Sequence, residues 1–162
     1  MPEQPEQAAL TAVRDRLDIQ DVLTRYCTGL DSRQWALLKE VFTPDAEADF
    51  GALGGRHLGV EAITDFVRGV LQGCDATQHL LGNFEVAVDG DRATASCYFQ
   101  AQHVLLGGAG GHTYLVGGSY RDRLVRSAAG WRITHRELIP TWSDGNAGLF
   151  AEAAGRLAAS AG

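Results

Sequence analysis

The sequence has few cysteines and no long apolar segment. Its cysteines, Cys27, Cys74 and Cys97, are odd in number and widely separated. This pattern argues against a disulfide framework and against a zinc site, so we expect buried, reduced thiols. No apolar run approaches the ~20 residues of a membrane-spanning helix. The first ten residues, MPEQPEQAAL, lack the basic segment and apolar core of a secretory signal, so we expect a cytoplasmic protein.

Positive charge is also scarce. Lysine and arginine together number 14 against 20 acidic residues, which gives a formal net charge of −6. Proteins that bind nucleic acids usually carry a basic patch, because phosphate contacts supply most of their affinity. The densest basic stretch, from Arg121 to Arg136, is interleaved with apolar residues, as on the outer face of a hairpin. We therefore expect no nucleic-acid partner and no membrane partner.

The composition that remains favours one folded domain. The chain has 162 residues, of which 45% are hydrophobic, enough for a sizeable core. We expect a disordered lead-in over residues 1–7 and a single domain over 8–145. The alanine-rich tail over 146–162 either forms a terminal helix or frays.

Apolar residues at helical spacing predict a helical first half. Three successive helices are expected over residues 8–17, 19–30 and 32–42. Asp18 would cap the second of these helices, and Asp31 with Ser32 would cap the third. The elements that follow are a stop at Thr43-Pro44-Asp45, a short strand over 46–50, a glycine-rich link over 51–55 and a helix over 61–71.

Alternating apolar residues predict a second half made of strands. Four long strands are expected over residues 77–88, 93–106, 113–125 and 131–142. An Asp-Gly pair at 89–90 is a strong hairpin signal, and Gly117-Gly118 suggests a bulge or sharp bend. Segregated helices and strands indicate an α+β fold with an antiparallel sheet. A strongly bent sheet would wrap around the helices and leave a cavity.

An ordered set of short motifs runs through the chain. They are IxxVLxxYxxxLD (19–31), VFTPDA (41–46), QHLLGN (78–83), VDGDRA (88–93), AQH (101–103), GGSYRDRL (117–124) and GWRITHR (130–136). Their order resembles the SnoaL-like members of the nuclear transport factor 2-like superfamily. The resemblance implies a cone-shaped α+β barrel, with helices packed on a strongly curved antiparallel sheet. It also implies a homo-oligomer, commonly a dimer or a trimer.

The polar residues are similar to those of the scytalone dehydratase and bile-acid dehydratase branch of that family. Those enzymes place a tyrosine and an aspartate around the first helices, a histidine on the first long strand, and a histidine or aspartate on the next. The matching positions here are Tyr26, Asp31, His79 and His103. The chain departs from the pattern at Thr141, where some members have a more polar or acidic group.

Asp31 and His79 form the core of the expected site. A carboxylate beside an imidazole selects its tautomer and makes the other ring nitrogen a better base. Spacing alone equally fits Asp31 as a helix cap and His79 as an ordinary strand residue. His103 has the same strand parity as Ala101 and Leu105, so it either completes a pocket or hydrogen-bonds within the core.

Tyr26 is either a buried core aromatic or a donor to a substrate carbonyl. His57 and His112 fall in glycine-rich loops, and His135 alternates with Arg136, so only one of these two can face a pocket. No histidine pair has the spacing of a metal site, and no glycine-rich loop precedes a helix to hold a phosphate, so we expect neither metal nor cofactor. The residues expected to bind substrate are Trp35, Phe50, Phe66, Ser119, Arg136 and Trp142.

The resulting hypothesis is a cofactor-independent lyase that dehydrates a hydrophobic cyclic or polycyclic hydroxy-ketone, as in polyketide or steroid metabolism. His79, oriented by Asp31, would remove the proton α to the carbonyl, and Tyr26 would stabilise the enolate. His103, or His79 returning its proton, would protonate the departing hydroxyl. Two alternatives stay open: an isomerase or cyclase that uses the same proton abstraction, and a non-catalytic module for ligand binding or oligomerisation.

Overall fold

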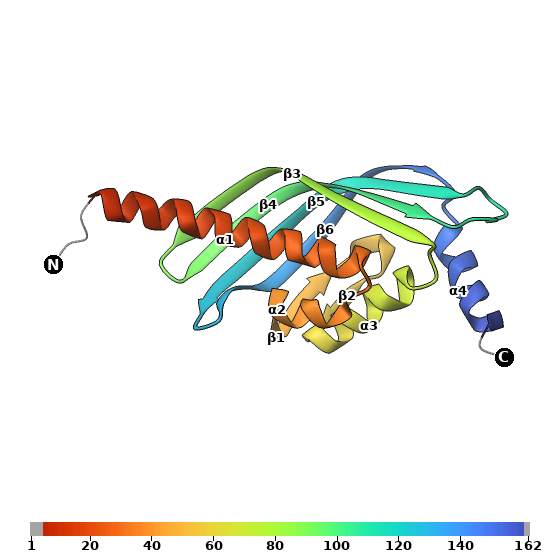
Figure 1. Ribbon diagram of the computed structural model, residues 1–162, viewed down its shortest axis with the longest axis horizontal. Helices are drawn as coiled ribbons and strands as arrows, with labels where there is room; N and C mark the ends of the chain where they lie inside the picture. Colours follow the sequence, from red (N-terminus) through yellow and green to blue (C-terminus); the bar gives the residue numbers. More distant parts are fainter. Residues whose placement is uncertain (1–4, 161–162) are drawn as a thin grey trace.

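A computed structural model describes residues 5–160, in which four α-helices pack beside one curved, six-stranded sheet (Figure 1). The strand order is β2-β1-β6-β5-β4-β3, so the sheet stays open between its edge strands β2 and β3. The helices are α1 (Pro5–Asp31), α2 (Leu38–Val41), α3 (Val60–Leu71) and α4 (Leu149–Ser160). The strands are β1 (Phe42–Asp49), β2 (Arg56–Leu58), β3 (Ala76–Asp89), β4 (Arg92–Val104), β5 (Thr113–Ser127) and β6 (Gly130–Gly145). This is the expected α+β architecture.

The long strands form the expected antiparallel meander, β3 to β6. Gly90 adopts a left-handed φ of 56° in the turn between β3 and β4, which confirms the hairpin predicted at Asp89-Gly90. The pairing of β5 with β6 shifts register between Gly117 and Gly118, so the predicted irregularity is confirmed as well. A side chain at Gly118 would overlap the Ile139 carbonyl, and glycine therefore allows β5 and β6 to approach closely there.

The first helix differs from the prediction. Residues expected to form two helices form the single helix α1, and Asp18 is an exposed residue within it rather than a cap. No proline interrupts residues 8–31, so the helical backbone continues through Asp18. Residues 5–7 of the predicted lead-in are also helical, and residues 1–4 of that lead-in lie outside the described range.

The segment after α1 is less helical than predicted. A 3-10 turn, η1 (Trp35–Leu37), leads into the short α2, and Phe42 already begins β1. Pro44 belongs to β1, where the pairing with β6 shifts register, and a bulge of this kind tolerates a residue without an N–H. A second 3-10 turn, η2 (Gly51–Leu53), and strand β2 occupy the predicted glycine-rich link and the residues after it.

The core lies between the sheet and the helices. The predicted apolar face of α1, made of Ile19, Leu23, Tyr26 and Leu30, is buried, and α1 runs along β3. Figure 1 shows α2 and α3 beside the C-terminal half of α1, with α4 at the far end of the long strands. All three cysteines are free and buried, which confirms the expectation of reduced thiols. None of the helices within residues 5–160 is long and apolar enough to cross a membrane.

Candidate active site

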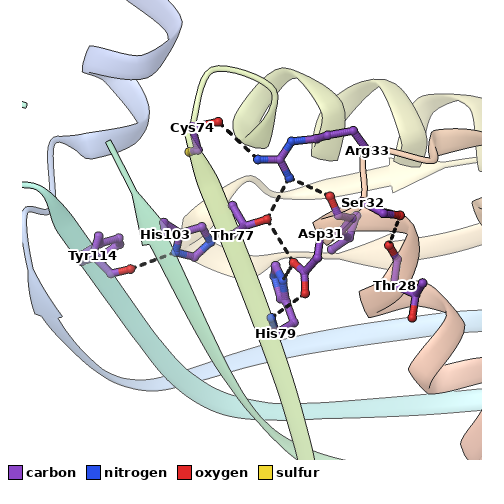
Figure 2. A network of polar contacts seen from close by, with 10 residues as sticks. Thr28, Asp31, Ser32, Arg33, Cys74, Thr77, His79, His103 and Tyr114 are labelled. Carbon is purple, nitrogen blue, oxygen red and sulfur yellow. Dashed lines mark hydrogen bonds and ion pairs between the residues drawn. The ribbon is translucent and has the colours of Figure 1, made fainter. Parts of the chain in front are cut away.

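Asp31 and His79 meet where the end of α1 packs on β3. The Nδ1 atom of His79 lies 2.7 Å from Oδ1 of Asp31, and the backbone N–H of His79 donates to Oδ2 at 2.8 Å (Figure 2). The predicted role of Asp31 as a cap for the next helix is therefore wrong, because its carboxylate binds β3 instead. An ionised carboxylate only accepts hydrogen bonds, so Nδ1 carries the proton and Nε2 of His79 keeps a free lone pair.

The surroundings of Asp31 keep its carboxyl group ionised. Burial raises the pKa of Asp31, but hydrogen bonds from the His79 ring, the His79 backbone and the Thr77 hydroxyl outweigh that effect and hold it below its usual range. The His79 side chain is only 5% exposed. The pair therefore has the geometry of a general base whose tautomer and orientation are set by a carboxylate.

His103 lies on β4 opposite Thr77, and it is therefore a diagonal neighbour of His79 on β3. Their ring centroids are 5.8 Å apart, and the rings meet edge to face. Nδ1 of His103 lies 3.0 Å from the Tyr114 carbonyl, which only accepts, so Nδ1 is the donor and Nε2 is unprotonated. Burial lowers the pKa of His103 to about 4, which keeps the ring neutral near pH 7.

Both histidines line a cavity between the sheet and the helices. The cavity has a volume of about 80 Å³, and its walls come from α1, α3, α4 and strands β3 to β6. Of the predicted site residues, it brings together Tyr26, Phe50, Phe66, His79 and His103. Apart from the two histidines, the wall consists of aliphatic side chains and six aromatic ones: Tyr26, Phe50, Phe66, Phe99, Tyr120 and Phe150. An apolar chamber with a few polar groups is typical of a site for a hydrophobic small molecule.

Arg136 lies in the core rather than at the mouth of the cavity. Its side chain is fully buried and makes two hydrogen bonds of 2.8 Å to Asp122. The guanidinium also packs on the rings of Tyr26 and Tyr120, at 4.3 and 4.2 Å from their centroids. Burial raises the pKa of Tyr26 above its usual range, so its hydroxyl stays protonated and able to donate. Arg136 thus supports a cavity wall, which corrects its expected role in binding substrate.

Three further predicted binding residues are absent from the described cavity wall. Ser119 precedes the inward-facing Tyr120, so strand alternation turns it to the outer face of the sheet. Trp142 is 46% exposed and covers Gly117. Trp35 lies in η1, with the guanidinium of Arg33 at 5.8 Å from its ring centroid. The expectation that Ser119, Trp142 and Trp35 line this pocket is therefore wrong.

The remaining histidines lie away from the Asp31–His79 pair. His57 stacks on Phe66 with ring centroids 4.2 Å apart, outside the cavity wall, and His135 lies 3.4 Å from Glu47. Because Arg136 points inward, His135 points away from the core, as their alternation requires. Within residues 5–160, no group of three or more His, Cys, Asp or Glu side chains is arranged to hold a metal ion.

Sequence reasoning missed Thr77, Arg33, Tyr120 and Phe150. Thr77 has the same strand parity as His79, and Tyr120 the same as Val116, so alternation contained a signal for both. No pattern in the sequence indicated that Arg33 or Phe150 would reach the site. Arg33 reaches the site from a turn, and Phe150 reaches it because α4 packs back onto the end of the sheet.

Comparison with known proteins places the chain in a family. The model of the SnoaL-like domain matches residues 11–137, so the chain belongs to the SnoaL-like family. The fold is that of the wider nuclear transport factor 2-like superfamily, represented by a protein from Salmonella enterica with a TM-score of 0.72, 18% identity, and coverage of 84% of this chain and 97% of that one.

Individual proteins are similar to this chain over most of its length. Rv2910c from Mycobacterium tuberculosis is 36% identical over 130 residues, which cover 79% of this chain and 86% of that protein. The Kfla4162 protein from Kribbella flavida has a TM-score of 0.79 at 26% identity, covering 87% of this chain and 99% of that chain. The hexachlorocyclohexane dehydrochlorinase LinA-type3 from Novosphingobium barchaimii has a TM-score of 0.74 at 22% identity, covering 86% and 95%.

Proposed function

We propose that this protein is a cofactor-independent lyase that removes water from a cyclic β-hydroxy ketone. The observation that carries the proposal is the 2.7 Å contact between His79 Nδ1 and Asp31 at the wall of an apolar cavity. This contact leaves Nε2 of His79 as an oriented base that needs no further group to remove a proton. The aromatic walls favour a hydrophobic ring as the substrate.

The reaction begins at the carbon between the carbonyl and the hydroxyl-bearing carbon. Nε2 of His79 takes a proton from this α-carbon, and Asp31 stabilises the imidazolium that forms. The electron pair of the broken C–H bond moves into an enolate, whose oxygen accepts a hydrogen bond from Tyr26. The enolate then collapses to a carbon–carbon double bond as the C–O bond breaks. His79 returns its proton to the departing hydroxide, which leaves as water.

The geometry favours His79 over His103 as the acid in the last step. A neutral His103 whose Nδ1–H binds the Tyr114 carbonyl has no proton on Nε2 to give. His103 instead accepts a hydrogen bond from the substrate hydroxyl and orients the leaving group. The name of the LinA-type3 neighbour describes an elimination of hydrogen chloride, a reaction that also joins loss of a proton to loss of a leaving group, and this supports an elimination here.

The probe for this proposal is 3-hydroxy-1-tetralone, which becomes the fluorescent 1-naphthol when it loses water. We expect the wild-type chain to accelerate this loss, and His79→Ala or Asp31→Asn to reduce kcat/KM by a factor on the order of 10² to 10⁴, the usual contribution of a positioned base. His112→Ala is the matched control, since His112 lies outside the cavity wall. Equal rates for the wild type and His79→Ala would rule out this mechanism.

A second probe separates dehydration from the alternatives. In deuterium oxide, 1-tetralone has α-protons to exchange but no hydroxyl to lose, and its exchange is followed by NMR. Exchange that depends on His79, combined with no dehydration of 3-hydroxy-1-tetralone, would favour an isomerase or cyclase. Absence of both activities would favour a non-catalytic binding module.

A further inference from the structure

Behind the Asp31–His79 pair lies a chain of hydrogen bonds that starts at Arg33. Nη1 of Arg33 lies 2.8 Å from Thr77 Oγ1, and Thr77 Oγ1 lies 3.0 Å from Oδ1 of Asp31 (Figure 2). A guanidinium only donates, so the Thr77 oxygen must accept from Arg33. The single hydroxyl proton of Thr77 is therefore directed at the Asp31 carboxylate.

Thr77 and His79 together hold both oxygens of Asp31. Oδ1 accepts from the Thr77 hydroxyl and from Nδ1 of His79, while Oδ2 accepts from the backbone N–H of His79. These donors all come from β3, two residues apart on the same face. The carboxylate plane is thus set by the strand that carries the base, and Asp31 cannot rotate without breaking a hydrogen bond.

Arg33 is itself held firmly in place. Its backbone has a left-handed φ of 59°, uncommon for a residue other than glycine, and this turn ends the path of α1. Its guanidinium also donates to the carbonyls of Leu30 at 2.7 Å and Cys74 at 3.4 Å. The cation therefore joins the last turn of α1, the end of the loop after α3, and β3.

We propose that Arg33 and Thr77 are positioning residues of the active site: Arg33 orients the Thr77 hydroxyl, and Thr77 holds the Asp31 carboxylate ionised and aimed at His79. This inference rests on the proposed function, because it assigns the two residues to the catalytic base. Neither residue belongs to the cavity wall, so both act through Asp31 rather than on the substrate.

The chain of hydrogen bonds from Arg33 through Thr77 to Asp31, called the relay below, controls the proton affinity of Asp31. The Thr77 hydrogen bond contributes to the lowered pKa of Asp31, so removing it should raise that pKa. Other titratable or charged groups near the pair are Cys27 on α1, Arg33 itself, and His103 on β4. A substitution at Thr77 removes none of these groups, so a shift that Thr77→Ser reverses would report on the relay.

The decisive experiment is a 13C NMR titration of the Asp31 carboxyl group in the full-length chain. In Thr77→Val, which keeps the shape of the side chain, we expect Asp31 to bind its proton about fivefold more tightly, the effect of one lost hydrogen bond. Thr77→Ser should restore the wild-type titration to within about twofold, because it restores the hydroxyl. The matched control is Thr94→Val, an exposed threonine on β4.

Arg33→Gly tests the first link of the relay without straining the backbone. Glycine adopts the left-handed conformation readily, so this variant removes the guanidinium and keeps the turn. We expect its Asp31 titration to shift in the same direction as in Thr77→Val. An unchanged titration in folded Thr77→Val and Arg33→Gly proteins would overturn the inference.

Turnover of 3-hydroxy-1-tetralone separates this inference from the proposed function. Loss of positioning should lower kcat by a factor on the order of ten in Thr77→Val with little change in KM, and Thr77→Ser should recover it. A shifted Asp31 titration in a chain that never dehydrates the probe would overturn the function and leave the relay in place. A shifted titration with unchanged kcat would overturn the positioning role.

Discussion

His79 and His103 keep the same ring nitrogen, Nε2, unprotonated through hydrogen bonds to two different acceptors. The Nδ1–H group of His79 donates a hydrogen bond to the Asp31 carboxylate, and that of His103 donates to the Tyr114 carbonyl. Each ring is left with an unprotonated Nε2. A carboxylate stabilises an imidazolium far better than a neutral carbonyl does, which is why the proposed mechanism has His79 accept the proton and His103 accept a hydrogen bond.

This difference predicts how stability depends on pH. The pKa of His103 is about 4 in the folded chain, below its usual value near 6.5, so the unfolded chain binds the extra proton between these values. The free energy of unfolding should therefore fall as pH drops from about 6.5 to about 4, by roughly 3 kcal/mol from this residue. Urea unfolding at a series of pH values measures the slope.

His103→Asn provides the test of that assignment, because an amide can still donate to the Tyr114 carbonyl but does not titrate. We expect its unfolding free energy to change less over this pH range than that of the wild type. His112→Asn should keep the wild-type slope. Identical slopes for the wild type and His103→Asn would contradict the assignment.

At the scale of elements, the bend of β5 against β6 shapes the cavity. The pairing of these strands shifts register at Gly117-Gly118, while Tyr120 and Val116 face the cavity from the same strand. A bulge increases the local twist of a sheet, which allows the long strands to curve around α1 and α3. The glycines thus contribute to the site without touching a ligand.

Alanine substitutions at Gly118 and Gly82 should distinguish the cost of a backbone clash from the effect of a lost glycine on chain entropy. A Cβ at Gly118 would overlap the Ile139 carbonyl, whereas a Cβ at Gly82 on β3 meets nothing within 4 Å. We expect Gly118→Ala to lower the free energy of unfolding by about 2 kcal/mol or more, because backbone must move. Gly82→Ala should stay within about 0.5 kcal/mol of the wild type. Chemical denaturation compares the two, and equal effects would argue against the packing explanation.

At the scale of the whole molecule, the six-stranded sheet within residues 5–160 is open and has two edge strands, β2 and β3. The predicted homo-oligomer, a dimer or a trimer, stays a prediction. Light scattering of the full chain after size-exclusion chromatography measures its mass directly. We expect two or three times the mass of a single chain, and a single-chain mass across the concentration range would contradict this expectation.

Much of the fold could be predicted because its signals are local. Helical spacing located α3 and the buried face of α1, alternation located β3 to β6, and Asp89-Gly90 located their first turn. The helix ends at Val41, just before the predicted stop at Thr43-Pro44-Asp45, but the stop residues themselves belong to β1, whose pairing with β6 is non-local. The directions of the Trp142 and Ser119 side chains could not be predicted for a similar reason, because the face of the sheet on which each lies depends on the bulge and on the register between β5 and β6.

The sequence by itself determined the order of the long elements α1, α3 and β3 to β6, the strand face of His103, and, through its ordered motifs, the family. These properties depend on neighbours within a few residues or on resemblance along the chain. Only the tertiary structure decided what Asp31 does, because its partner His79 is 48 residues away. It also moved Arg136 from the substrate to the core, since Asp122 and two tyrosine rings surround it there. A buried charge needs a partner of opposite charge that is close in three dimensions, and the spacing of residues along the sequence does not give that distance.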